Sequence, residues 1–545
     1  MPTFAEMVQA FLQELYEDQP VMASALGLTA YDDRLDDLSA AAFDARRRRS
    51  AAWLQRFDQV PEEGLDPEER IDRALIRSHL RGEQIMSDWE MWRRQPAVYL
   101  GPCLNGVFVL FLHRLRPEAE LVEAAASRLR AVPKALEDGR RNLRADLTPR
   151  IYVERALAQV RAAVHYLAEL LPAEARDPIL RAELEDAATG AVLALEGFRD
   201  YLEWLVERAR GSWAIGEERY SRLLQEKELL GYDARALRER GRAEYERVAA
   251  ELRRLARLMA DTDDWVAVLR QLNQDHPPTP DAMRAAYAEW TGRARAFLQE
   301  RGLVTLPPGE ECAVEPSPHF QRPVQAVASY HQPPPFSPSL RGHFFVPYPP
   351  DDASPDEVRK RLEGNCYAGI PTTAVHETYP GHHWHLVTAK ANPRPVRHVL
   401  RTPFFTEGWA LYAEQVMREQ GFFADPRHEL YQHEATLFRA ARIVVDTSLH
   451  LGEMGFDEAV QFMMERANLP EPTARAEVGR YCSWPTQAAS YLTGCLEILR
   501  LRERFLAARG LSGVEGLRRF HDALAASGSL PIALAERAVL GSPAG

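Results

Sequence analysis

The chain contains 545 residues, 46% of them hydrophobic and 27% charged, which is the composition of a globular protein and not of a disordered or fibrous one. Its formal net charge is −12 and it has no long basic run, which argues against nucleic acid as a partner. No apolar run approaches the roughly 18 residues of a membrane span, and the five scattered cysteines include no CxxC pair, which argues against a disulfide framework or a cysteine-based zinc site.

The first residues and the cysteines also bear on location. Residues 1–6 are amphipathic and acidic, without the basic region and the apolar stretch of a signal peptide. Cysteines without a pairing pattern are typical of a reducing compartment. We therefore expect a cytoplasmic protein, a monomer or a homodimer, with no membrane or nucleic-acid partner.

Helical periodicity dominates the first 300 residues. Apolar side chains at helical spacing predict an amphipathic helix over residues 3–18, and Asp233 is a good N-cap for a long helix through Met259. Residues 99–102, which end in Gly-Pro, should break the helical pattern. The other expected helices cover residues 41–92, 107–110, 117–145, 150–170 and 178–209.

The character of the chain changes over residues 302–350, where prolines become dense and helical periodicity stops. Runs of β-forming residues at 324–330 and 343–348 predict short strands. We therefore expect a mainly α-helical fold with a small β element near residues 320–350.

Residues 342–347 have the pattern of an edge strand, because Pro347 at their end is compatible with an edge and not with a sheet centre. In zinc enzymes that cleave peptides, an edge strand near the metal can pair with an extended substrate. Phe345 is the substrate-binding candidate in this strand. A small hairpin that only caps the helical body is an equally good interpretation.

The most informative stretch contains four of the sixteen histidines within ten residues. In a His-Glu-x-x-His motif, positions i and i+4 share one helix face, so both imidazoles reach one zinc while the glutamate activates a water molecule. Here His376 and Glu377 are followed by Pro380 at that position, and a straight helix would point His382 about 120° away. Because Pro380 lacks an N–H and Gly381 permits unusual backbone angles, a break there would turn His382 back toward His376.

His383 is the alternative second ligand. It lies near the azimuth of His376 but about 10 Å further along a helix axis, which is too far for two nitrogens that share one zinc at about 2 Å each. We therefore predict one zinc ion per chain at His376 and His382, with Glu377 as the general base. The other interpretation is a histidine-rich buried helix end without a metal.

A third protein ligand is expected in the helical stretch 406–414. Glu407 is the candidate, because Gly408 leaves room for close approach and the apolar run 403–405 favours burial. Glu414 lies two turns later on the same face. The alternative for Glu407 is a solvated glutamate, which is the commoner case for a lone glutamate.

Two further groups supply candidates for contacts with the substrate. Arg442, Asp446 and His450 follow one another at i, i+4 and i+8 on one helix face, which either points into a polar channel or forms an ion network. From this face we take Arg442 as substrate-binding and His450 as catalytic. Tyr491 is a phenol donor for the negative charge that develops on the carbonyl oxygen, with substrate-binding Gln487 one turn before it. The alternative for Tyr491 is a core tyrosine.

The patterns HExxPGH, EGWAxYxE and YxxxPxQAxSYxxG, which begin at His376, Glu407 and Tyr481, together resemble the DUF885 family of bacterial proteins. That family resembles gluzincin metallopeptidases, such as the thimet-oligopeptidase-like and carboxypeptidase-Taq-like enzymes, which are largely helical with the active site deep in a channel. The resemblance covers nearly the whole chain. It implies zinc ligands at His376, His382 and Glu407, with Glu377 as the base.

These observations predict a zinc-dependent hydrolase, and more narrowly a metallopeptidase that cleaves short peptides with metal-activated water. A zinc hydrolase of a non-peptide amide or ester and a non-catalytic protein with a structural metal are the alternatives. Because the chain is too long for one simple core, we expect a two-lobed body around a deep channel. Residues 1–300 would form the helical scaffold and channel wall, and residues 301–545 the catalytic region with the small sheet, the metal helix and the C-terminal helices.

Overall fold

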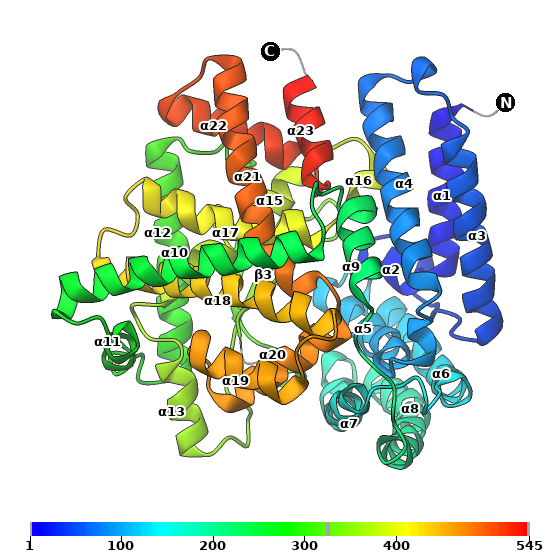
Figure 1. The fold of residues 1–545 in the computed structure, drawn as a ribbon. Coiled ribbons are helices and arrows are strands. Elements are labelled where there is room, and N and C mark those ends of the chain that lie inside the picture. Colours follow the sequence, from blue (N-terminus) through cyan, green and yellow to red (C-terminus); the bar gives the residue numbers. More distant parts are fainter. Residues whose placement is uncertain (1–2, 323–326, 542–545) are drawn as a thin grey trace.

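The computed structural model describes residues 3–322 and 327–541. The fold is mainly α-helical with one small sheet, as the sequence predicts (Figure 1). The helices that precede the sheet are α1 (Phe4–Asp18), α2 (Pro20–Ala25), α3 (Ala40–Asp58), α4 (Pro67–Ser87), α5 (Ala97–His113), α6 (Glu118–Asn142), α7 (Arg150–His165), α8 (Pro178–Val206), α9 (Glu217–Arg222), α10 (Ala234–Ala260), α11 (Trp265–Leu272) and α12 (Pro280–Arg301). Those that follow it are α13 (Pro355–Glu363), α14 (Ile370–Glu377), α15 (His382–Ala389), α16 (Pro395–Val399), α17 (Pro403–Glu419), α18 (Pro426–His450), α19 (Phe456–Arg466), α20 (Glu471–Ser483), α21 (Gln487–Arg509), α22 (Gly513–Ala526) and α23 (Ile532–Gly541).

Local sequence explains several helix boundaries. At the start of α10, the side chain of Asp233 accepts a hydrogen bond from the N–H of Ala236 at 2.8 Å, which confirms the predicted N-cap. The helical region predicted over residues 41–92 consists of separate helices, α3 and α4. A new helix starts because Asp66 caps α4 and Pro67 occupies its first position.

The break predicted at residues 99–102 is wrong. α5 continues through these residues with Pro102 inside it. Tyr99 and Leu100 are fully buried, so the packing of this apolar helix outweighs the hydrogen bond that the proline removes.

The sheet consists of β1 (Glu311–Pro316), β2 (Ser329–His331) and β3 (Arg341–Val346) in the order β1-β3-β2. β3 pairs in parallel with β1 and antiparallel with β2, so it is the central strand. The prediction that residues 342–347 form an edge strand is therefore wrong. Pro347 is compatible with this position because it follows the last paired residue of β3.

The strand predicted at residues 324–330 corresponds only in part to β2. Residues 324–326 lie outside the described residues. β1 was not predicted, because only Ala313 in it is buried and the strand lacks the alternation of buried and exposed residues that marks a half-buried strand.

Two large hydrophobic cores hold the helices together. One joins the N-terminal helices α1, α3 and α4 to α15, α17, α21, α22 and α23, and it includes Phe57, Ile76 and Trp409. The other lies among α5, α6, α7 and α8 and includes Leu129 and Phe198. In Figure 1 the blue N-terminal helices stand near the red C-terminal ones, and the cyan helices lie below them. The N-terminal segment thus packs against helices that carry the candidate site.

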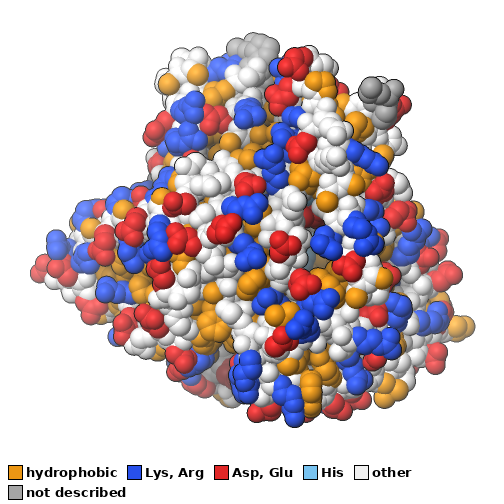
Figure 2. Space-filling model, turned by 45° about the vertical axis from the view of Figure 1, so that its right-hand side comes forward, with side chains coloured by type: hydrophobic (Ala, Val, Ile, Leu, Met, Phe, Trp, Pro, Cys, Tyr) orange, Lys and Arg blue, Asp and Glu red, His pale blue; other side chains and the backbone are white. Residues whose placement is uncertain are grey.

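Figure 2 shows basic and acidic side chains interspersed over the face that it presents. In the described ranges, no single helix is both long and apolar enough to cross a bilayer. One pair bent by 94°, Pro67–Arg93 with Ala97–His113, meets that test by length and composition only.

Candidate metal centre

The histidine-rich stretch forms two short helices with a break between them. α14 ends at Glu377 and α15 begins at His382, so the predicted interruption at Pro380 and Gly381 is present. The indole Nε1 of Trp409, on α17, donates a hydrogen bond to the carbonyl oxygen of Pro380 at 2.8 Å. This contact ties the break to α17.

The break requires glycine at position 381 for a steric reason. A Cβ atom on Gly381 would lie 1.9 Å from the carbonyl oxygen of His376 and 2.2 Å from that of Val375. The φ of Gly381 is −66°, so close backbone approach, and not a left-handed conformation, excludes other residues. The end of α14 and the start of α15 can come this close only without a side chain there.

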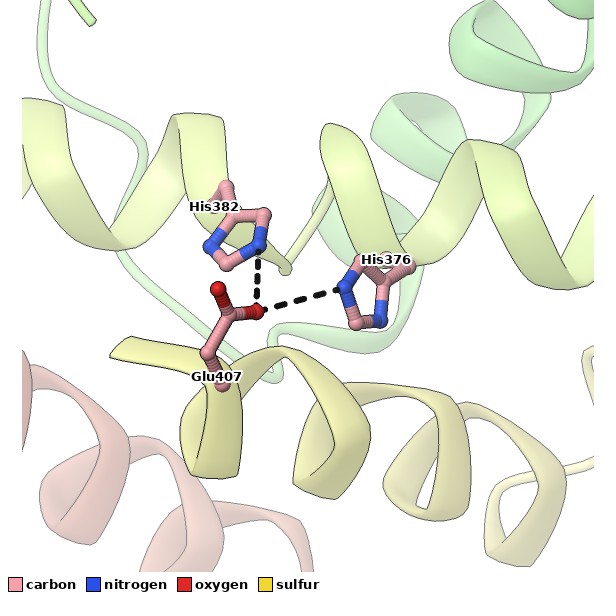
Figure 3. Close-up of side chains that lie close together, drawn as sticks. All are labelled: His376, His382 and Glu407. Atoms are coloured by element: carbon pink, nitrogen blue, oxygen red, sulfur yellow. Dashed lines mark ion pairs between the residues drawn. The ribbon is translucent and has the colours of Figure 1, made fainter. Parts of the chain in front are cut away.

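The break brings together three donor side chains from three helices. Figure 3 shows His376 on α14, His382 on α15 and Glu407 on α17 pointing toward one another. Oε2 of Glu407 lies 3.4 Å from Nε2 of His382 and 3.9 Å from Nε2 of His376. Tetrahedral zinc with bonds of about 2.0–2.1 Å separates its ligand atoms by about 3.3 Å, so this set of two imidazoles and one carboxylate fits a zinc ion.

His383 lies outside this group. Its Nδ1 is 2.9 Å from the hydroxyl of Tyr330, and its Nε2 is 2.8 Å from Oε2 of Glu310, which also pairs with Arg295. Both ring nitrogens therefore have partners in a buried polar network. The structure brings His382, and not His383, to His376.

Glu414 is a functional candidate to which the sequence analysis gave no role. Its Oε1 lies 2.7 Å from Nδ1 of His376, and its side chain is fully buried. A carboxyl group hydrogen-bonded to Nδ1 holds the imidazole in one orientation, so that Nε2 faces Glu407. The signal in the sequence was the seven-residue spacing from Glu407, which places both carboxylates on one face of α17.

Close helix packing positions Glu407. A Cβ atom on Gly408 would lie 2.6 Å from Cα of Gly494, and one on Gly494 would lie 1.8 Å from the carbonyl oxygen of Phe404. α17 and α21 therefore touch backbone to backbone, which confirms the close approach predicted at Gly408. This contact also sets Tyr491 on α21 beside the donor group.

The donor group opens into a cavity of about 660 Å³. N-terminal helices supply part of its wall, through Met22 on α2 and Val109 on α5. Of the residues predicted for the site, those that line the cavity are His376, Glu377, His382, Glu407, Gln487 and Tyr491.

Burial and neighbouring charges both shift the pKa values of the acids and bases in this site. Burial raises the pKa of Glu377 to about 7 and that of Glu414 to about 8, and it lowers the pKa of His376 well below its usual value. Burial also disfavours the charged forms of His382 and Glu407, but their mutual attraction outweighs it. The pKa of Glu407 is therefore about 2, and that of His382 is raised.

Tyr491 has the surroundings of a positioned phenol. The guanidinium carbon of Arg442 lies 4.6 Å from its ring centroid, and Nε2 of Gln487 lies 3.4 Å from its hydroxyl. Arg442 does not line the cavity; it is buried behind Tyr491, with Nη2 2.7 Å from Oε2 of Glu477 and Nε 3.1 Å from the hydroxyl of Tyr481.

His450 is placed away from the cavity. Its Nε2 lies 3.0 Å from the carbonyl oxygen of Tyr481, its ring lies 5.9 Å from that of Tyr220, and it is fully buried. Arg442 and His450 share one face of α18, but eight residues separate them by about 12 Å along the axis. Of these two residues, only Arg442 contacts a residue that lines the cavity, which is Tyr491.

Phe345 is also absent from the described residues that line the cavity. It is 4% exposed and packs against His331 of β2, with ring centroids 5.3 Å apart. Because β3 is the central strand, β2 lies between Phe345 and the cavity, and Ser329, Tyr330 and His331 of β2 line it instead.

A second group of possible donors occurs at Glu251, Glu429 and His433, whose ligand atoms lie within 4.8 Å of one another. There the carboxylates already have cationic partners. Glu251 pairs with Arg254 at 2.6 Å, and Glu429 pairs with Arg418 at 3.5 Å. These contacts favour an ion-pair network over a metal site.

Two solved bacterial proteins share this fold. A protein from Shewanella oneidensis, described as a "putative lipoprotein" of unknown function, is 21% identical, with a TM-score of 0.79 and coverage of 98% of this chain and 99% of that chain. A "putative lipoprotein" from Colwellia psychrerythraea is 19% identical, with a TM-score of 0.82 and coverage of 98% of each chain. No curated protein sequence matches the chain. The profile of DUF885, described as a bacterial protein of unknown function, matches residues 20–539, so the chain belongs to the DUF885 family.

Proposed function

We propose that this protein is a zinc-dependent metallopeptidase that cleaves short peptides. The observation that carries the proposal is one arrangement: His376, His382 and Glu407 converge within ion-pair distance, and Glu377 lines the same cavity beside them. Two histidines with one glutamate form the donor set of a hydrolytic zinc site that keeps an open position. When bound, zinc supplies the Lewis acidity that polarises a carbonyl group and favours the ionisation of water.

Glu377 and Tyr491 are the residues of this chain that act on the reacting atoms. Glu377 takes a proton from the attacking water and later passes it to the leaving amine. Tyr491 donates its hydroxyl proton in a hydrogen bond to the carbonyl oxygen as negative charge develops there. Arg442 is a positioning residue, because it stacks on the Tyr491 ring and does not reach the cavity.

The cavity supports a small substrate. Its volume of about 660 Å³ lies in the range of pockets for small ligands, which is roughly 300–1,000 Å³. Its walls come from α2, α5, β2, α14, α15, α17 and α21, so segments from both halves of the chain form it. A folded protein does not fit such a space, whereas a peptide of a few residues does.

Metal analysis tests the first half of the proposal. We expect about one zinc per chain after purification and dialysis, as in mononuclear hydrolytic sites. His382→Ala should lose the metal, whereas His433→Ala, in the arginine-paired group, should keep it. Equal zinc content in His382→Ala and the parent protein would contradict the assigned donors.

Hydrolysis tests the second half. A library of short peptides, with amide and ester panels beside it, should give peptide cleavage products by mass spectrometry. Glu377→Gln should bind zinc like the parent and lose turnover by a factor of about 10² to 10⁴, the usual contribution of a general base. Unchanged turnover in Glu377→Gln, or cleavage of esters without cleavage of peptides, would overturn the proposal.

A further inference from the structure

One residue of the cavity has a charge that the proposed chemistry does not use. Arg401 immediately precedes Thr402, the N-cap of α17, and lines the same cavity as the metal donors. Among the described residues that line this cavity, it is the only lysine or arginine. Its side chain is open to solvent, and it forms no ion pair with any residue in the described ranges. The protein that surrounds it nevertheless lowers its pKa.

The guanidinium of Arg401 is oriented but not neutralised. Its Nη1 donates a hydrogen bond to Oε1 of Gln332, next to β2, at 2.6 Å. No hydrogen bond joins its Nε or Nη2 to another described residue. Nε and Nη2 lie on the same side of the guanidinium and can donate two parallel hydrogen bonds to one carboxylate. Such a paired interaction is stronger than a single hydrogen bond between neutral groups.

We infer that Arg401 binds the C-terminal carboxylate of the substrate, so that the substrate class is short peptides with a free carboxyl end. This inference rests on the proposed function, because it assumes that the metal centre in the same cavity cleaves peptides.

The other charges in the cavity are consistent with a substrate bound by its carboxyl end. Among the described lining residues, Glu377 and Glu407 are the only carboxylates, and both belong to the proposed chemistry. Burial lowers the pKa of His113 to about 3 and that of His331 to about 4, so both are neutral at pH 7. The cavity therefore has an unpaired cation for a carboxylate and no spare anion for an α-amino group.

The spacing between Arg401 and the donors suits a peptide of a few residues. Arg401 lies two residues before α17, and Glu407 lies four residues into that helix, so their backbones are on the order of 10 Å apart. An extended peptide spans roughly 3.3–3.6 Å per residue, so about two or three residues fit between the carboxylate and the cleaved bond. Apolar side chains cover much of the wall, and these are Met22, Leu26, Val109, Leu386 and Trp484. We therefore expect the preferred substrates to carry apolar side chains.

The test compares peptides that differ only at the carboxyl end. N-acetylated di-, tri- and tetrapeptides that end in leucine are assayed with zinc-loaded protein, each as the free acid and as the C-terminal amide. The parent should cleave the acid with a kcat/KM about 100-fold above that of the amide, the loss expected when one partner of a hydrogen-bonded charge pair is removed. Arg401→Gln should lose this preference through a higher KM for the acid, with the amide unaffected.

Two further variants sharpen the comparison. Arg401→Lys keeps the charge without the paired hydrogen bonds, so its preference for the acid should be intermediate. Arg130→Gln changes an exposed arginine of α6 that lies outside the cavity, and it should behave like the parent. Equal cleavage of acid and amide by the parent, or an equal loss on both in Arg401→Gln, would overturn the inference.

A binding measurement separates failure of the inference from failure of the proposed function. Two zinc-loaded proteins, the single variant Glu377→Gln and the double variant that also carries Arg401→Gln, are titrated calorimetrically with the same acid and amide peptides. Tighter binding of the acid that disappears with Arg401→Gln supports the inference, even if the parent hydrolyses no peptide and the proposed function fails. Equal or absent binding of both forms overturns it.

Discussion

Oε1 of Glu414 lies 2.7 Å from Nδ1 of His376, within hydrogen-bond distance, and this contact leaves Nε2 of the imidazole to face Glu407. Both carboxylates belong to α17 and lie two turns apart. One helix therefore carries a candidate metal ligand and the residue that orients another.

The substitution Glu414→Gln should weaken zinc binding. The amide oxygen of the variant could still accept the hydrogen bond but would not make the imidazole more basic, so we expect a loss of about 10- to 100-fold in zinc affinity. Competition titration with a chromogenic chelator measures it. Glu419→Gln, at the end of the same helix, is the control and should bind zinc like the parent. An unchanged affinity in Glu414→Gln would mean that this contact is only structural.

Gly381→Ala should damage both stability and zinc binding. The added Cβ would meet the backbone oxygens of His376 and Val375, which cannot move away without opening the break. We expect a loss of unfolding free energy on the order of 3 kcal/mol and a zinc content well below one per chain. Denaturant unfolding and metal analysis check the two expectations.

The control for that substitution is Gly190→Ala, in the exposed middle of α8, where a Cβ atom meets nothing within 4 Å. It should be neutral or should stabilise the protein by about 0.5–1 kcal/mol, since alanine favours helix. If Gly381→Ala and Gly190→Ala have the same free energy of unfolding, the steric explanation of the break is wrong.

Tyr491→Phe should lower kcat more than it raises KM. The phenol hydroxyl would contribute mainly when charge develops on the carbonyl oxygen, and loss of one such donor costs about 10²- to 10³-fold in kcat. Phenylalanine keeps the ring that stacks on Arg442, so zinc content and thermal stability should stay close to those of the parent. A variant with normal kcat would leave Tyr491 as a core residue.

Asp446 should make stability depend on pH. Burial raises its pKa to about 7, although the Tyr220 hydroxyl and the Thr486 N–H donate hydrogen bonds to it. The folded state therefore holds the proton more tightly than the unfolded state, where the pKa is about 3.9. The stabilisation is complete below about pH 4 and is lost as the pH rises through about 7.

The measurement is the thermal midpoint at pH 5 and pH 7.5. Asp446→Asn keeps an acceptor for the Tyr220 hydroxyl but has no titrating proton, so the difference between the two pH values should shrink. Glu434 and Glu414 also have pKa values raised by burial, to about 7 and about 8, and they remain in the variant, so part of the dependence should persist. An identical pH dependence in both proteins would show that Asp446 titrates normally.

Parts of the site that depend on neighbours in sequence could be predicted. The break at Pro380 and Gly381 follows from residues within one helical turn, and so does the return of His382 toward His376. Gly408 signalled a close helix contact, although its partner Gly494 lies far along the chain. The resemblance of three short motifs to DUF885 agrees with the match over residues 20–539.

Other parts could not be predicted, because they depend on which distant segments pair. β3 became a central strand only because β1, about 30 residues earlier, adds to its other side. β2 pairs with the other edge of β3 and lies between Phe345 and the cavity, so β2 lines the cavity instead. His450 lies on the same face of α18 as Arg442, as predicted, but it is too far along the helix to reach the candidate metal donors.

By itself, the sequence determined the helical class, the choice of His376, His382 and Glu407 as candidate donors, and the break that lets two of them meet, because these features depend on residue types and on contacts within a few residues. Only the tertiary structure decided which charges are paired. In the folded chain, Glu414 contacts His376 and Glu310 contacts His383, whereas Arg401 lies in the cavity without an anionic partner among the described residues. Such pairings follow from how segments far apart in the chain pack together, which no local pattern encodes.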